Sequence, residues 1–166
     1  CAYLVVYPYT KRFTWTSNLL LGWALGIAPT AAWIGVTGSL PWEAVLLSTG
    51  VAVWAGSFDI LYHIQDVEFY KKTGLHSIAQ RFGVPIAFHS AKLLDVMSLG
   101  CLLVLGIWMD LNWPYYLGWL VASALLIYKY LIVSPDDISN LGMVFFRINA
   151  YVSSVLFVGV LAAVLV

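Results

Sequence analysis

The sequence predicts an all-α protein built as a bundle of membrane-spanning helices. Its 166 residues are 62% hydrophobic and only 10% charged, whereas charged residues make up about a quarter of a typical soluble domain. The 8 tryptophans and 10 tyrosines agree with aromatic belts at two membrane interfaces. Because the bilayer core offers no water to backbone groups, each long hydrophobic run must be a helix rather than an open strand.

The hydrophobic residues fall into a short first run and five long ones. The chain begins with neither an initiator methionine nor a signal-peptide pattern. We therefore expect residues 1–7 to be the end of a helix, and the chain to be the C-terminal piece of a longer protein. The expected spans, each near the ~20 residues that cross a bilayer core, are 17–37, 42–63, 85–109, 115–133 and 143–166.

Polar segments separate these spans. A hinge at 8–14 precedes the first span, which tolerates Pro29 because neighbouring helices can satisfy the freed backbone groups. Pro85 suits the opening of the third span. Short turns are expected at 38–41 and 110–114, and longer loops at 64–84 and 134–140. With no linker in sight, residues 1–166 should form a single membrane domain.

The basic residues are distributed asymmetrically. All of them lie in or near the connections at one end of the bundle: Lys11, Arg12, Lys71, Lys72, Arg81, Lys92, Lys129 and Arg147. The positive-inside rule places that end in the cytoplasm. We expect a multi-pass protein of the cell's inner (plasma) membrane, with the lipid bilayer as its surrounding, no nucleic-acid partner and the C-terminus outside.

An acidic and basic cluster at 58–83 is the candidate functional site. Asp59 and Asp66 are separated by two helical turns, so they share a face if the helix continues. Two carboxylates at a membrane boundary repel each other unless a cation joins them, and oxygen ligands favour Mg²⁺, which also reaches substrate phosphates. The alternative is that Asp59 pairs with an interfacial lysine and Asp66 is simply solvated.

Basic side chains flank these carboxylates, namely Lys11, Arg12, Lys71, Lys72 and Arg81. In most membrane proteins such residues only set topology. Beside carboxylates and a bridging metal they can hold a diphosphate and stabilise it as a leaving group. His63 lacks a second histidine or a cysteine at metal-ligand spacing, which argues against a soft-metal site. Lys92 and Asp95, one turn apart, are expected to neutralise each other.

Several segments resemble known sequence motifs. DILYHIQD at 59–66, GLHS at 74–77 and RFG at 81–83 resemble the second aspartate-rich motif of the UbiA-type intramembrane prenyltransferases. YPYTKRFT at 7–14 is similar to the Tyr-x-x-x-Lys segment of that family. The resemblance covers essentially the whole chain. It is nearest to the 4-hydroxybenzoate polyprenyltransferases and to their naphthoate-using relatives in menaquinone synthesis.

The resemblance implies a nine-span bundle around a cavity that opens to lipid, of which this chain supplies the last five spans. In that family Mg²⁺ joins aspartates to a polyprenyl diphosphate; the diphosphate leaves, and an aromatic acid is alkylated in ubiquinone or menaquinone synthesis. Carried over by position, Asp59 and Asp66 become metal ligands and Lys11 a catalytic cation. Residues near the substrates would be Tyr7, Arg12, Tyr62, Lys71, Lys72 and Arg81.

Two departures from the family pattern affect these expectations. The first aspartate-rich motif is absent, so we expect the piece alone to be inactive. The family commonly has an acid four residues after Asp66, where this chain has Tyr70. Glu68 can replace that acid as a metal ligand only if the helix ends near Asp66, because two residues of a continuous helix differ by ~200°.

Other functions remain as alternatives. A naphthoate-type acid can replace the benzoate as acceptor. A transporter or channel segment would use Asp59, Asp66 and Asp95 for an ion or proton path, but it leaves the basic, glycine-punctuated loop unexplained. A purely structural membrane subunit explains the spans and leaves the charged cluster without a role.

Overall fold

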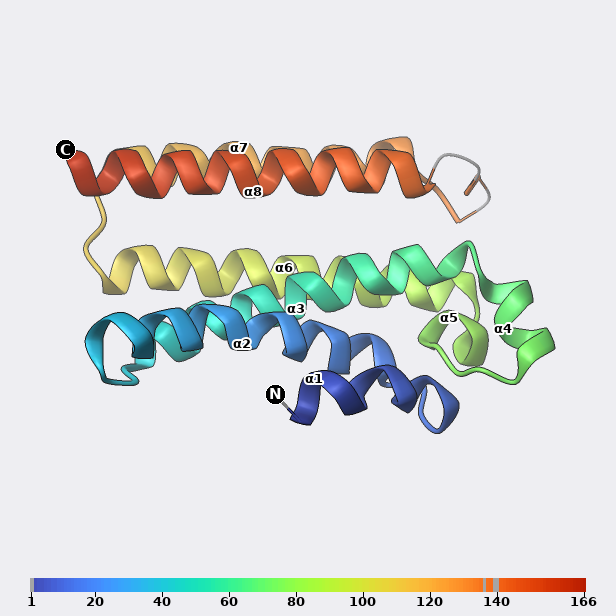
Figure 1. Ribbon diagram of the computed structural model, residues 1–166. Coiled ribbons are helices and arrows are strands. Elements are labelled where there is room, and N and C mark those ends of the chain that lie inside the picture. The colour runs from blue at the N-terminus through green and yellow to red at the C-terminus, as the bar shows by residue number, and fades with distance from the viewer. Residues whose placement is uncertain (1, 136, 139–140) are drawn as a thin grey trace.

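A computed structural model describes residues 2–135, 137–138 and 141–166, and the named elements within these ranges are all helices. In chain order they are α1 (Ala2–Val6), the 3-10 helix η1 (Tyr7–Arg12), α2 (Ser17–Thr37), α3 (Trp42–Ile64), α4 (Val67–Thr73), α5 (Ile78–Phe82), α6 (Val84–Trp108), α7 (Trp113–Ile132) and α8 (Leu141–Leu165) (Figure 1). The all-helical prediction is confirmed. Five helices, α2, α3, α6, α7 and α8, are long and apolar enough to cross a membrane.

The predicted spans correspond to these five helices, with ends that differ by no more than two residues. Pro29 lies inside α2 without ending it, and Pro85 occupies the first turn of α6, as expected. The helix end expected at 1–7 is observed as α1, although Cys1 lies outside the described residues. The loop expected at 134–140 also lies partly outside them.

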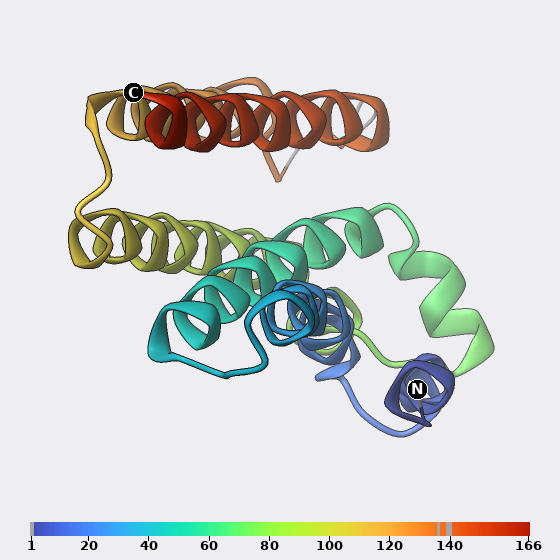
Figure 2. The same ribbon diagram turned by 60° about the vertical axis from the view of Figure 1, so that its left-hand side comes forward.

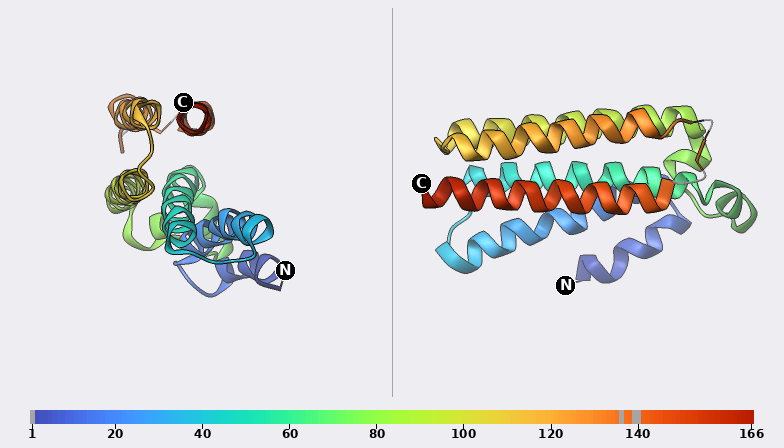
Figure 3. Two further views of the ribbon diagram at one scale, coloured as in Figure 1. Left: turned by 90° about the vertical axis from the view of Figure 1, so that its left-hand side faces the viewer. Right: turned by 90° about the horizontal axis from the view of Figure 1, so that it is seen from above.

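The long helices form two groups. α3 packs against α2 on one side and α6 on the other, while α7 and α8 pair as a hairpin. Figure 2 shows the hairpin lying alongside the α2–α3–α6 group, and the end-on view in Figure 3 shows the same separation. α3 is therefore the central helix of its group, and its C-terminal end leads into the segment that contains the candidate site.

Small residues allow α2 and α3 to approach closely. A Cβ atom added at Gly22 would lie 2.2 Å from the Ala52 carbonyl oxygen, and one at Gly26 would lie 2.7 Å from the Ser48 oxygen. Two glycines one turn apart are the small-residue pattern that brings membrane helices into backbone contact. This contact fixes the N-terminal turn of α2 beside the C-terminal half of α3.

Hydrogen bonds from long side chains of α7 to backbone oxygens of α6 connect the hairpin to α6. Tyr115 donates its hydroxyl hydrogen to the Leu102 carbonyl oxygen at 2.6 Å, and the Trp119 Nε1 donates to the Leu99 oxygen at 2.9 Å. Because these side chains are long, they hold α7 and α6 together at several points while leaving space between the two helix groups.

Near the charged end of the bundle, Asp95 of α6 is bound by two residues of α7. Its Oδ2 atom lies 2.6 Å from Lys129 Nζ and accepts a hydrogen bond from the Tyr130 hydroxyl at 2.6 Å. The prediction that Asp95 pairs with Lys92 is therefore wrong. Lys92 is exposed, whereas Asp95 is buried, and the Lys92 ammonium lies over the Tyr130 ring, 5.2 Å from its centroid.

The segment 64–84, expected as a loop, contains the short helices α4 and α5. Gly74 caps the C-terminal end of α4, and its φ of 70° is the left-handed conformation that suits glycine. Ser77 caps the N-terminal end of α5, and its hydroxyl accepts a hydrogen bond from the Gln80 N–H at 3.0 Å. Their buried residues, including Val67 and Ile78, join the apolar core formed by α3 and α6. Both helices lie at one end of the bundle with η1 (Figure 1).

Candidate functional site

A buried carboxylate at the end of α3 is the centre of the candidate site. Asp59 is 6% exposed. Its Oδ2 atom accepts a hydrogen bond at 2.8 Å from Nδ2 of Asn18, a fully buried residue in the first turn of α2. Ionisable residues within membrane helices are costly and are usually functional. Asn18 therefore holds an acid that the surrounding apolar residues would otherwise disfavour.

His63 connects this acid to Lys11. The His63 Nδ1 atom lies 2.7 Å from the Asp59 backbone oxygen and 3.3 Å from Asp59 Oδ1. On the other side of the ring, Nε2 lies 3.0 Å from Lys11 Nζ. A chain of contacts thus runs from a half-buried ammonium through an imidazole to a buried carboxylate.

The segment between α4 and α5 closes over this network. The His76 N–H donates to the Lys11 carbonyl oxygen at 2.8 Å, and the Ser17 hydroxyl donates to the His76 oxygen at 3.3 Å. The Ile78 N–H donates to Asn18 Oδ1 at 3.3 Å, which leaves the Asn18 amide nitrogen directed at Asp59. Segments distant in the sequence therefore hold the two polar groups in place.

Asp66 is not on a continuous helix with Asp59, as α3 ends at Ile64 and Asp66 directly precedes α4. The Asp66 carboxylate makes no hydrogen bond or ion pair within the described part of the chain. Tyr70, one turn into α4, nevertheless faces the site: its ring meets that of His63 edge to face with 5.0 Å between centroids. Burial, followed by the nearby charges of Asp59 and Asp66, raises the Tyr70 pKa to about 12.

Glu68 lies on the exposed side of α4. Its carboxylate binds Lys71 Nζ at 2.8 Å, and hydrogen bonding to Lys71 lowers the pKa of Glu68 below its usual value. The α3 helix does end near Asp66, which was the condition for Glu68 to act as a ligand. The exposed pairing with Lys71 instead directs its carboxylate to solvent.

The other predicted substrate residues surround the site without entering the buried network. Tyr7 is half-buried, and Arg12 and Lys72 are exposed. Arg81 is exposed and lies over the Trp15 ring, 5.9 Å from its centroid. Lys11 is thus the member of the predicted basic set that reaches Asp59, through His63.

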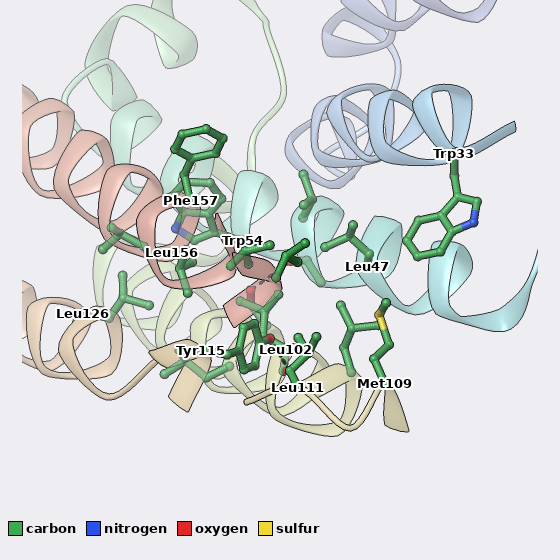
Figure 4. Close-up of a pocket in the computed structure, with 18 residues that line it drawn as sticks. Trp33, Leu47, Trp54, Leu102, Met109, Leu111, Tyr115, Leu126, Leu156 and Phe157 are labelled. Atoms are coloured by element: carbon green, nitrogen blue, oxygen red, sulfur yellow. Dashed lines mark hydrogen bonds between the residues drawn. The ribbon is translucent and has the colours of Figure 1, made fainter. Parts of the chain in front are cut away.

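A hollow of about 240 Å³ adjoins Asp59 and is lined by Phe58, Asp59, Tyr62, Phe146 and Asn149. A second hollow shares Phe58, Phe146 and Asn149 with it and extends to Trp54. A third, of about 350 Å³, includes Trp54 and continues between α3, α6 and the α7–α8 hairpin (Figure 4). Neighbouring hollows share lining residues, so the three follow one another from the acid along α3, and together they are called the apolar groove below.

The far part of this groove is almost wholly hydrophobic. Figure 4 shows Leu102, Tyr115 and Leu126 around it, with Trp33 and Met109 toward the opposite end. The helical rise of ~1.5 Å per residue makes the path along α3 from Asp59 to Leu47 about 18 Å long. The site therefore combines a charged end with a long apolar channel.

The described residues offer Mg²⁺ a partial set of ligands. No group of three or more His, Cys, Asp and Glu side chains that could hold a metal ion occurs among them, so the closed four-ligand pattern of structural zinc does not fit. Mg²⁺ commonly takes one or two carboxylates, completed by water and substrate phosphates. Asp59 and Asp66, both near Tyr70, meet that description.

Sequence reasoning missed two residues of this network. Asn18 carried a signal, since a fully polar amide in an apolar span is uncommon. His63 was considered only as a metal ligand, whereas its ring nitrogens contact Lys11 and Asp59.

Comparisons with known proteins concern the family and the fold of the chain. The family model described as "UbiA prenyltransferase family" matches residues 1–151. The 4-hydroxybenzoate octaprenyltransferase of Vibrio campbellii (strain ATCC BAA-1116) is 32% identical over 161 residues, covering 95% of this chain and 55% of that protein. The protein of the same name from Francisella tularensis subsp. novicida (strain U112) is 30% identical over 136 residues, covering 82% and 48%.

A solved structure shows the same fold. The apo structure of a UbiA homolog from Aeropyrum pernix K1 superimposes with a TM-score of 0.81 over 97% of this chain and 60% of that chain, at 20% sequence identity. The chain spans about half the length of the curated relatives it matches.

Proposed function

The chain belongs to the UbiA prenyltransferase family, and we propose that the protein transfers a polyprenyl group from a polyprenyl diphosphate to a 4-hydroxybenzoate-like aromatic acid in quinone synthesis. One observation carries the proposal: the buried Asp59, coupled to Lys11, lies where an apolar groove begins. A polyprenyl diphosphate has the same two parts, an anionic head and a long apolar tail. The names of the Vibrio and Francisella relatives support this substrate class.

Lys11 binds the diphosphate head in this proposal. A cation beside the leaving group stabilises the negative charge that develops as the allylic carbon–oxygen bond breaks. The exposed Arg12, Lys72 and Arg81 attract the anion to this end of the bundle.

Asp59 and Asp66 would hold Mg²⁺, together with oxygen atoms of the diphosphate. When bound, the ion offsets the charge of the leaving diphosphate. The chain's own contribution is to fix Asp59 through Asn18 and to leave Asp66 without a competing partner in the described residues. Glu68, being exposed and paired with Lys71, is not needed for this role.

The aromatic residues beside Asp59 line the place of reaction. Phe58, Tyr62 and Phe146 surround the hollow, and aromatic rings favour an adjacent cation such as an allylic cation. The acceptor's ring carbon forms the new carbon–carbon bond and then loses its proton to water. The apolar groove holds the tail and excludes water from the cation.

The reaction takes place at the cytoplasmic side of the inner membrane in this proposal. The bundle end that carries η1, α4 and α5 is also the end that carries the basic residues, which the positive-inside rule assigns to the cytoplasm.

The test uses the full-length protein, purified in lipid nanodiscs and supplied with Mg²⁺ and octaprenyl diphosphate. With 4-hydroxybenzoate we expect pyrophosphate release together with a prenylated product. Asp59→Asn and Asp66→Asn should each lower kcat/KM by about 100-fold or more, since removing a charge used in the transition state lowers turnover rather than folding. Product analysis by mass spectrometry measures the effect.

Asp110→Asn is the matched control. Asp110 lies in the turn after α6, and its φ of 49° is a conformation that asparagine also accepts. Its activity should equal that of the wild type. Product only with a naphthoate acid would move the acceptor to that class, and no product with either acid would refute the proposed reaction.

A further inference from the structure

We propose that His63 is a spacer that keeps the Lys11 ammonium and the Asp59 carboxylate apart, so that both charges stay available for substrate. The inference rests on the proposed function, because it is the diphosphate head and its Mg²⁺ that need these two charges. His63 acts through its neighbours and is a positioning residue.

The hydrogen bonds define the state of the ring. A charged Lys11 has only N–H donors, so the His63 Nε2 atom at 3.0 Å accepts its hydrogen bond. Nε2 then carries no proton, and the hydrogen of a neutral ring is on Nδ1. That hydrogen is donated to the Asp59 backbone oxygen at 2.7 Å. Nδ1 also lies 3.3 Å from Asp59 Oδ1 and 3.2 Å from Asn18 Nδ2. Nε2 thus faces Lys11 while Nδ1 faces Asp59 and Asn18, and the ring separates the ammonium from the carboxylate.

The ring is also fixed in orientation. His63 is 4% exposed, and the rings of Tyr70 and Tyr62 meet it edge to face with centroids 5.0 and 5.9 Å away. The bond to the preceding helical turn prevents the imidazole from swinging out of α3. A rigid, buried ring therefore stands between two groups of opposite charge.

Without the ring, these two groups should combine. Lysine has a flexible four-carbon stem and can follow a nearby carboxylate. In a poorly solvated environment the attraction between opposite charges is strong, so Lys11 would bind Asp59 directly. That ion pair would weaken both the binding of diphosphate by Lys11 and the binding of Mg²⁺ by Asp59.

Two substitutions separate the functions of the two nitrogens. His63→Asn keeps an N–H near the position of Nδ1 but ends short of Lys11, whereas His63→Gln carries a carbonyl oxygen far enough to accept from Lys11. In the full-length protein we expect His63→Asn to weaken pyrophosphate and Mg²⁺ binding by about tenfold each, the scale of a charged hydrogen bond. His63→Gln should lose much less.

His89→Asn is the matched control for the local change. The His89 Nδ1 atom makes the same contact to the carbonyl oxygen four residues earlier, Pro85, at the same 2.7 Å, but His89 is exposed on α6. Binding of pyrophosphate and Mg²⁺ by this variant should match the wild type.

The decisive comparison adds Lys11→Met. Once the ammonium is gone, no direct ion pair can form, so His63→Asn should no longer weaken Mg²⁺ binding. Isothermal calorimetry with Mg²⁺ and pyrophosphate measures this on detergent-solubilised protein, alongside KM and kcat with octaprenyl diphosphate. Unchanged binding in His63→Asn, or an equal loss of Mg²⁺ affinity with and without Lys11, would overturn the spacer role.

The two proposals fail differently. If His63→Asn weakens binding as described but the wild type prenylates no aromatic acid, the proposed reaction is wrong and the spacer stands. If the wild type prenylates its acceptor while His63→Asn binds pyrophosphate and Mg²⁺ normally, the spacer is wrong and the reaction stands.

Discussion

Tyr70 occupies a position where the family commonly has an acid, and in the structure its side chain is buried beside the candidate site. The side chain is 5% exposed and near both Asp59 and Asp66. With a pKa raised to about 12, its hydroxyl stays protonated at neutral pH. Because the folded protein favours the neutral phenol, Tyr70 contributes to the free energy of unfolding. This contribution is complete below pH ~10, the ordinary pKa of tyrosine, and is lost as the pH rises through about 12.

Tyr70→Asp should strengthen Mg²⁺ binding at the proposed metal site. Without a cation, a third carboxylate beside Asp59 and Asp66 would destabilise the fold, because like charges repel. With Mg²⁺ present, the three carboxylates would bind the ion together. We expect the variant to unfold at a lower temperature than the wild type in chelator. We also expect it to gain more stability from Mg²⁺ and to need less Mg²⁺ for half-maximal turnover.

Thermal unfolding across an Mg²⁺ series tests this expectation. Tyr70→Phe keeps the ring and should leave the Mg²⁺ requirement unchanged. If Tyr70→Asp responds to Mg²⁺ no more than the wild type does, residue 70 is not beside the metal. A loss of activity in Glu68→Gln equal to that in Asp66→Asn would instead restore Glu68 as a ligand.

At the level of the helices, the contact between α2 and α3 is what brings Asn18 to Asp59. Gly22 lies one turn after Asn18 and faces the backbone of Ala52 and Gly56. Backbone atoms cannot rotate away as a side chain can. The packing of these two helices and the geometry of the acid are therefore linked.

Gly22→Ala should destabilise the protein by about 2–3 kcal/mol, near the upper range for overpacking, and should reduce activity by moving Asn18. Gly35→Ala, in the same helix, is the control: nothing lies within 4 Å of the added Cβ, so the change should be neutral or stabilising by up to about 1 kcal/mol. Thermal unfolding in detergent compares the two. Equal unfolding midpoints for the two variants would show that α2 and α3 can move apart to accept the added methyl group without loss of stability.

At the scale of the whole molecule, the proposed topology places the polar end of the bundle, which carries α4, on the cytoplasmic side of the membrane. Cysteine at Thr73 in α4, in a background without native cysteines, should be shielded from a membrane-impermeant thiol reagent in intact cells. Cysteine at Ser39 should be labelled. Both positions are exposed in the structure, whereas Ser77 is buried and would be shielded on either side. The reverse labelling pattern would invert the proposed topology.

Much of this architecture was predictable from the sequence, and the remainder has identifiable physical causes. The hydrophobic runs located the spans, and the intramembrane acid Asp59 was evident as a candidate. The end of the span near residue 63 was predicted as well, but the short helices α4 and α5 inside the expected loop were not. No glycine or proline marks the start of α4: Gln65 and Asp66 are ordinary residues with φ of −64° and −97°.

Long-range pairings were also beyond sequence reasoning. Lys11 and His63 are 52 positions apart, and Asp95 and Lys129 are 34 apart. Helical periodicity indicates which residues share a face of one helix, but not which face of another helix they meet. Lys92 was therefore assigned to Asp95, although the more distant Lys129 is the residue that binds it.

The buried Asp95–Lys129 pair has a consequence for how the protein is made. Asp95, in the middle of α6, would alone oppose entry of its helix into lipid by roughly 2.5–3.5 kcal/mol. Lys129, in the last turn of α7, would oppose entry by less, and the pair offsets both charges. α6 and α7 should therefore leave the translocon together as a hairpin rather than one after the other. Asp95→Leu or Lys129→Met alone should leave an uncompensated charge and send more chains to degradation, and the double substitution should restore the amount inserted.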